Sequence, residues 1–418
     1  MTTEPQPLGL DAAEVASKAL AEIVRDPQVR ANPHPRYHQM RSASPVLHFP
    51  ETGEWLLTRY EDCEAVLRDP RFSANPAHRV SDIPLERRTP REQAAASGEL
   101  STLLFIDPPD HTRIRGLVSK AFTPRTIERL RPHIVEITDH LLDEAAELGT
   151  FDVVSHLGYQ LPVTVICELM GVPLDDRHLF GSWASDASRL LDGDVLSEAE
   201  TMAGFTAMME FINYFNHLFD ERRANPRDDL VSALLAVESE GERLSESELR
   251  SIVLLLFIAG HETTMNLIGN GTSALLHHPD QLRLVVDDPT RIGATIEEAL
   301  RYDGPVHLTG RIATVDIELA GHTIARGEAA ITLLAAANRD PARFPHPDAF
   351  DIERPDNRHL TFSHGIHYSL GAALARVEGQ VAIGRLVERF PDLHLAAEPT
   401  YRDHFILRGL NELMVTNS

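Results

Sequence analysis

One stretch of the chain, from Ser245 to His278, contains no proline over about 33 residues and limits the fold more than any other segment. It opens with Ser245-Glu246-Ser247-Glu248, a capping box in which the serine and the second glutamate satisfy each other's backbone N–H groups. A helix of this length is ~50 Å long. Its middle is apolar on most sides, so we expect it to cross the interior of the protein.

The rest of the chain predicts further helices and a few short strands. Helix start signals recur between residues 113 and 278, and no strand–helix–strand alternation or phosphate-binding glycine loop is present. We therefore expect a mainly α protein with small β-sheets, in one domain of residues 1–418. The predicted elements are a strand at 53–59, helices at 61–68, from Thr123-Pro124 and at 376–390, and small hairpins within 306–334.

Composition limits the environment and the partners. The formal net charge of −24 argues against nucleic acid or an anionic membrane as a partner. The two cysteines, Cys63 and Cys167, are separated from each other and from any metal-binding pattern, which suits a reducing cytosol. Residues 1–10 are polar and rich in proline, and the longest apolar run, 252–259, is far below the ~20 residues of a membrane helix. We expect a cytoplasmic protein.

The segment Phe362-Ser363-His364-Gly365-Ile366-His367-Tyr368-Ser369-Leu370-Gly371 resembles the haem-ligand loop of the cytochrome P-450 family, Phe-x-x-Gly-x-x-x-Cys-x-Gly. Phe362, Gly365 and Gly371 match this pattern, whereas Ser369 stands at the position of the ligand cysteine. With the motifs below, the resemblance covers about residues 30–415. It implies the P-450 fold of the soluble bacterial type, with the long helix over a haem b.

The long helix contains Ala259-Gly260-His261-Glu262-Thr263-Thr264 at its middle. Glycine inside a helix costs about 1 kcal/mol against alanine, so a reason for Gly260 is expected. The resemblance places Ala259 and Gly260 beside the haem and makes Glu262 and Thr263 the catalytic pair that relays protons. A carboxylate and a hydroxyl next to an apolar cavity can pass protons in this way. The alternative is a buried helix whose threonine bonds the carbonyl four residues earlier.

Two sets of charged residues complete the resemblance. Glu298 and Arg301 lie three residues apart, on one helix face, and the family adds a downstream arginine, here Arg354, to form a structural ion-pair set behind the haem. Taken alone, such a pair is usually solvated. The residues that match the haem-propionate contacts of the family, each of which in isolation reads as a surface cation, are His111, Arg115, Arg311 and His367.

A serine at position 369 changes the expected chemistry. A cysteine thiolate donates electron density to haem iron, and a serine oxygen is a harder and far less acidic ligand. Monooxygenation is therefore expected to be impaired or redirected. Three explanations stand: a deliberate Cys→Ser substitution, a natural member with another use, or ligation by Tyr368 or His367. Besides a haem enzyme, the sequence allows a haem or small-molecule binding protein and a non-redox cyclisation enzyme.

The resemblance also implies the partners. The chain carries no flavin or iron–sulfur motif, so electrons would come from a separate ferredoxin and ferredoxin reductase to a monomer. The substrate would be small and apolar or polyketide-like, in a pocket drawn from 74–100, 175–195, the middle of the long helix, 306–309 and 405–406. The candidates for a basic ferredoxin-docking patch, which otherwise are scattered solvated charges, are Arg113, Lys120, Arg339, Arg343, Arg358 and Arg376.

Overall fold

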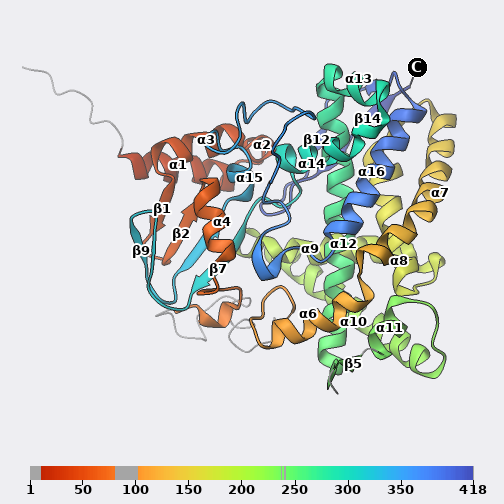
Figure 1. The fold of residues 1–418 in the computed structure, drawn as a ribbon, viewed down its shortest axis with the longest axis horizontal. Coiled ribbons are helices and arrows are strands. Elements are labelled where there is room, and N and C mark those ends of the chain that lie inside the picture. Colours follow the sequence, from red (N-terminus) through yellow and green to blue (C-terminus); the bar gives the residue numbers. More distant parts are fainter. Residues whose placement is uncertain (1–10, 81–101, 237, 240–241, 418) are drawn as a thin grey trace, which may run out of the picture.

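The computed structural model describes residues 11–80, 102–236, 238–239 and 242–417. Figure 1 shows a smaller region that holds the largest sheet and the N-terminal helices, beside a larger region of long helices. The α-helices described are α1 (Ala12–Arg25), α2 (Pro27–Ala31), α3 (His34–Ala43), α4 (Tyr60–Arg68), α6 (Asp110–Ala121), α7 (Pro124–Leu148), α8 (Gln160–Met170), α9 (Arg177–Arg189), α10 (Glu198–Ala224), α11 (Leu230–Ala236), α12 (Glu246–His277), α13 (Pro279–Asp287), α14 (Ile292–Asp303), α15 (Leu334–Ala337) and α16 (Ala372–Arg389).

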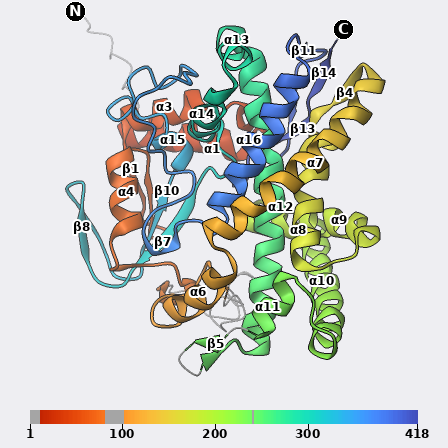
Figure 2. The ribbon, with the colours of Figure 1, turned by 45° about the vertical axis from the view of Figure 1, so that its right-hand side comes forward.

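The predicted central helix is α12, which has 32 residues. Both halves of the capping box form at its N-terminus, because the Ser245 side chain accepts from the Glu248 N–H while Glu248 accepts from the Ser245 N–H. The helix contacts α8, α9, α14 and α16, and Figure 2 shows it running through the helical region. It is long and apolar enough to span a membrane, but 67% of its most apolar window is buried inside the protein.

The largest sheet has the strand order β1-β2-β10-β7-β3, with β2 and β10 parallel and the other pairs antiparallel. Its strands come from residues 46–73 and 309–332, so the sheet joins two segments that are far apart in the sequence. The strands described are β1 (Val46–Phe49), β2 (Glu54–Leu57), β3 (Phe72–Ser73), β4 (Thr150–Asp152), β5 (Glu238–Ser239), β6 (Glu242–Arg243), β7 (Thr309–Ala313), β8 (Ile317–Leu319), β9 (His322–Ile324), β10 (Ala329–Thr332), β11 (His394–Leu395), β12 (Thr400–Tyr401), β13 (Leu410–Glu412) and β14 (Met414–Thr416).

The predicted elements are confirmed where the structure describes them. The strand at 53–59 is β2, the helix at 61–68 is α4, and β8 and β9 form a small hairpin. Thr123 caps α7 by accepting the Thr126 N–H, and α16 begins four residues earlier than predicted, at Ala372. Most of the predicted irregular segment 74–100 lies outside the described residues.

Candidate functional site

The 362–371 segment, which we call the ligand loop, connects directly to the N-terminus of α16. The Ser369 N–H donates to the Phe362 carbonyl at 2.9 Å and closes the loop at its neck. Gly365 has φ +69, and a Cβ there would lie 2.6 Å from the Leu67 carbonyl oxygen, so this position accepts only glycine. Gly371, in contrast, has ordinary backbone angles and 4.0 Å of room toward the Ser369 Oγ. Its small size therefore leaves space next to position 369.

The N-terminus of α16 favours a negatively charged ligand at position 369. The helix begins at Ala372, three residues after Ser369. The free N–H groups of a first helical turn and the helix dipole stabilise a nearby anion and lower the pKa of a thiol at such a place. The loop thus supplies electrostatic support for an anionic axial ligand, although the residue present is a serine.

The four basic side chains at 111, 115, 311 and 367 come together from three separate segments. His111 and Arg115 share a face of α6, Arg311 projects from β7, and His367 lies in the ligand loop, with its ring 4.4 Å from that of His111. Arg115 donates to the Tyr368 carbonyl at 2.6 Å. Arg311, 5% exposed, donates to the Gly310 carbonyl at 2.7 Å. The sequence already placed His111 and Arg115 on one helix face, and the resemblance grouped all four; the fold brings the three segments together.

Among the described residues, Asp107 is the acidic group that acts on this basic cluster. Burial, together with charge repulsion from Arg311, His111 and Arg115, lowers the pKa of His367 to about 3. Burial also lowers the pKa of Arg311 to about 10, with only Asp107 acting in the opposite direction. The Nε2 atoms of His111 and His367 are buried with no hydrogen-bond partner in the described part of the chain. Two ligand carboxylates would supply the missing acceptors, so the residues present fit a haem with its propionates.

The neighbours that could replace Ser369 as a ligand have other contacts. His367 belongs to the basic cluster, against His111. The Tyr368 hydroxyl accepts from Arg376 at 3.0 Å. Both neighbours are therefore engaged by other groups of the protein.

The middle of α12 presents an accessible face between buried ones. Ala259 is exposed, and Gly260 and Thr263 are half-buried, while Glu262 and Thr264 are buried. A Cβ at Gly260 would meet only Ile166 Cδ1, at 3.7 Å. Crowding by the described residues therefore does not explain the glycine at position 260. Because Gly260 has no side chain, it leaves this face of α12 open.

The predicted relay pair has partners within the protein. The Thr263 hydroxyl donates to the Ala259 carbonyl at 2.6 Å, which is the alternative arrangement considered from the sequence. Glu262, 1% exposed, forms an ion pair with Arg402, whose other terminal nitrogen donates to Ser185 Oγ at 2.9 Å. The Glu262 Oε2 atom has no partner among the described residues, so one carboxylate oxygen is held and the other is available.

The Glu298, Arg301 and Arg354 side chains form one buried group. Arg301 donates to both Glu298 oxygens, at 2.8 and 2.7 Å, and both side chains are fully buried. Arg354 lies 3.3 Å from the same carboxylate, and Asn357 donates to it at 3.0 Å. The remaining Arg301 donors bind the carbonyls of Asn338, Pro347 and Ala349. This group ties α14 to the segment that precedes the ligand loop.

Several candidates for the docking patch are not free surface cations. The prediction for Arg339 is wrong, because this residue is 7% exposed and donates twice to the Tyr302 carbonyl. Arg113 pairs with Glu248, and Arg376 pairs with Glu297 at 2.6 Å. Arg343 and Arg358 share Asp356, both at 2.9 Å. Ion pairs on the folded surface neutralise most of the positive charge that was expected of the docking patch. Sequence spacing does not show these pairs.

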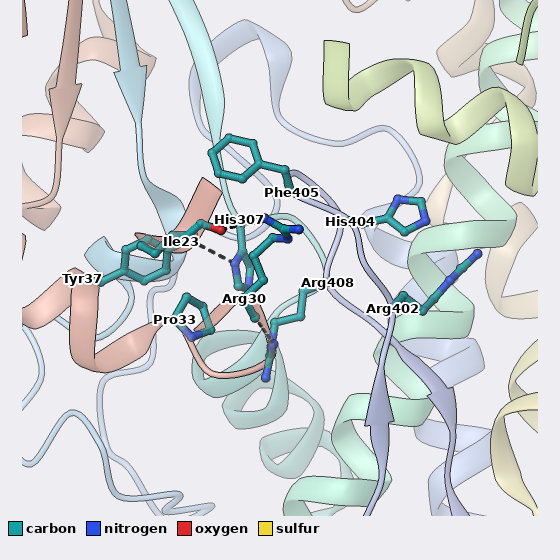
Figure 3. Close-up of a pocket in the computed structure, with 9 residues that line it drawn as sticks. All are labelled: Ile23, Arg30, Pro33, Tyr37, His307, Arg402, His404, Phe405 and Arg408. Carbon is teal, nitrogen blue, oxygen red and sulfur yellow. Dashed lines mark hydrogen bonds between the residues drawn. The ribbon is translucent and has the colours of Figure 1, made fainter. Parts of the chain in front are cut away.

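A polar pocket lies between the N-terminal helices and the 402–408 segment (Figure 3). Its arginines have acidic partners: Arg30 with Asp403 at 2.5 Å, and Arg408 with Asp303. The Arg402 side chain extends away from Arg408 toward α12, where it meets Glu262. Two residues of the predicted substrate pocket border this pocket, whose lining is Ile23, Arg30, Pro33, Tyr37, His307, Arg402, His404, Phe405 and Arg408.

Sequence reasoning missed two buried contacts beside the site. Glu262 and Arg402 are 140 residues apart, and nothing in either motif indicates the pair. Glu378, on α16, is 2% exposed and lies near Thr264 of α12. Burial raises the pKa of Glu378 to about 8, and the Thr264 hydroxyl acts in the opposite direction. A charged residue on the apolar face of the predicted helix at 376–390 was the one available indication of this contact.

Known proteins show the same fold and similar sequences. The family profile described as Cytochrome P450 matches residues 191–285 and 292–403. The vitamin D(3) 25-hydroxylase of Pseudonocardia autotrophica is 43% identical, over 92% of this chain and 94% of the relative. The cytochrome P450 monooxygenase PikC of Streptomyces venezuelae is 42% identical, over 92% and 91%. A crystal structure of P450BioI, with a fatty-acid-ligated acyl carrier protein, superimposes with a TM-score of 0.86 at 39% identity, over 93% of this chain and 99% of that one.

The long central helix and the loop before α16 therefore define a haem-monooxygenase type of fold. The chain belongs to the cytochrome P450 family. The family implies a haem cofactor, and the relatives above include a named hydroxylase and a named monooxygenase.

Proposed function

We propose that this chain is a haem b protein of the P450 family in which Ser369 stands at the axial ligand position. The convergence of His111, Arg115, Arg311 and His367, with two unpartnered buried imidazole nitrogens, carries the proposal. These four side chains would hold the propionates. Gly365 and Gly371 would let the ligand loop pass close to the ring, with Phe362 beside it.

When bound, the haem would supply the oxygen-activating redox chemistry of the family. Ser369 would give its iron a weaker, harder donor than a thiolate, so native oxygenation is impaired or redirected. In the middle of α12, the free Glu262 oxygen and the Thr263 hydroxyl would hold and move protons at the accessible face around Ala259 and Gly260. The buried Glu298–Arg301–Arg354 group would keep the segment before the ligand loop in place.

The relatives support a small organic substrate. One is named for hydroxylation of vitamin D(3), another is a 6-deoxyerythronolide B hydroxylase, and one solved structure carries a hexadecenoic acid attached to an acyl carrier protein. We propose an apolar or polyketide-like substrate for this single-domain, cytoplasmic and monomeric protein. A separate ferredoxin and its reductase would supply electrons.

The ferrous–CO spectrum of hemin-reconstituted protein tests the proposal. We expect stoichiometric hemin binding and a Soret band to the blue of the long-wavelength band for which the family is named, because an oxygen ligand replaces a thiolate. Ser369→Cys should move the band to that longer wavelength. Failure to bind hemin would contradict the haem role and leave a small-molecule or non-redox function. A long-wavelength band in the unaltered protein would contradict oxygen ligation.

A further inference from the structure

Arg376 contacts both ends of the ligand loop. Its guanidinium carbon lies 4.5 Å from the centre of the Phe362 ring, at the start of the loop. Its Nη1 donates to the Tyr368 hydroxyl at 3.0 Å, one residue before position 369. Since the Ser369 N–H donates to the Phe362 carbonyl, the two residues that Arg376 contacts flank the neck of the loop.

The Arg376 guanidinium is itself fixed from behind. Its Nε and Nη2 atoms donate to the two oxygens of Glu297 on α14, at 2.6 and 2.9 Å. This two-point contact sets the plane of the guanidinium as well as its position. The Arg376 side chain is 28% exposed and that of Glu297 is 30% exposed, so the pair is partly shielded from water.

A buried histidine completes the support. The His359 Nδ1 atom accepts the Thr361 N–H at 3.2 Å, so the proton lies on Nε2, which is 3.3 Å from Glu297. Burial alone would raise the pKa of Glu297, but the hydrogen bonds from His359 and Arg376 outweigh it and hold this pKa at about 2. Glu297 thus stays ionised and anchors both the residue before the loop and the arginine after it.

We infer that Arg376 is a positioning residue that clamps Phe362 and Tyr368 against Glu297 and thereby orients the side chain at position 369 toward the haem. This inference rests on the proposed haem role of the loop. It replaces the expectation that Arg376 docks a ferredoxin. Glu297 neutralises the charge of the guanidinium, and the donors of the guanidinium are occupied by Glu297 and Tyr368.

The test compares Arg376→Gln and Arg376→Lys with Arg358→Gln, which removes an arginine that is 80% exposed and paired with Asp356. In the haem-free protein, hydrogen exchange of peptides that span 362–371 should rise in Arg376→Gln and not in the control. After reconstitution, hemin transfer to an acceptor protein should be about tenfold faster, a loss equivalent to about 1.4 kcal/mol. Lysine should rescue part of both effects, because it keeps the charge but not the fork.

Each outcome of these experiments either supports or overturns the inference about Arg376. Loop exchange and hemin release equal to those of the control would overturn the inference. Faster exchange spread evenly over the whole chain would also overturn it, because Arg376 would then act on general stability. If the unaltered protein binds no hemin, the haem role fails, while loop exchange in the haem-free protein still decides whether the clamp exists.

Discussion

At the scale of single residues, Ser363 has an unfavourable backbone conformation in the ligand loop. Its φ is +62, in the left-handed region that favours glycine, and its buried Oγ has no hydrogen-bond partner among the described residues. The Ser363 N–H donates to the Leu360 carbonyl at 2.8 Å, which closes a turn just before Gly365.

Ser363→Gly should therefore stabilise the protein. Relief of the left-handed strain and of the unpaired hydroxyl outweighs the added freedom of glycine in the unfolded chain, and we expect a gain of about 1 kcal/mol in the free energy of unfolding. Urea denaturation measures it. Ser363→Ala is the matched control, because it removes the hydroxyl and keeps the Cβ. An equal gain from alanine would assign the effect to the hydroxyl alone.

At the scale of elements, the contact between α12 and α16 contains a buried carboxyl. Burial raises the pKa of Glu378 from its ordinary 4.5 to about 8. Between these pH values the folded protein keeps a proton that the unfolded chain has lost, so stability falls as pH rises. Below pH 4.5 both states are protonated and the group makes no difference.

Glu378→Gln should remove this pH dependence. Its stability advantage over the unaltered protein should be absent near pH 4.5 and grow to roughly 4 kcal/mol by pH 8, since one pKa unit corresponds to about 1.4 kcal/mol. Chemical denaturation at a series of pH values measures the difference. The exposed Glu147→Gln controls for the loss of a charge. A constant difference across this range would show that Glu378 is ionised in the folded state.

At the scale of the whole molecule, the surface charges limit how an electron donor can dock. The net charge is −24, and the candidate arginines are largely paired with acids. Arg358 is paired with Asp356 but 80% exposed, and Lys120 is exposed, so these two side chains are more accessible to a partner than Arg113 or Arg376.

If an acidic ferredoxin docks there, reduction of the hemin-loaded protein under CO should slow with rising ionic strength. Arg358→Glu and Lys120→Glu should each slow it several-fold at low salt, and the effect should vanish at high salt. Stopped-flow absorption measures the rate. Arg389→Glu, which reverses a side chain 53% exposed and bound to Asp143 at the end of α16 away from the ligand loop, is the control. Salt-independent rates that are equal in all variants would refute this docking site.

The sequence by itself determined the secondary-structure elements and which residues make up the candidate site. The capping box at Ser245 and the absence of proline fix α12, because these are local properties of the backbone. Likewise, the turn at Gly365 depends on a φ that glycine adopts freely. The spacing of Glu298 and Arg301 on one helix turn predicted their pairing, which the structure shows at 2.7 Å.

Only the tertiary structure decided which distant groups meet. Glu262 finds Arg402 across 140 residues, and Arg376 turns inward to Glu297 instead of outward to a partner. Such contacts arise from the packing of α12, α14 and α16 and of the 402–408 segment, and a side chain's neighbours in space are not encoded in its neighbours in sequence. The physical reason is burial, because a charge that packing removes from water must find a partner, wherever along the chain that partner lies.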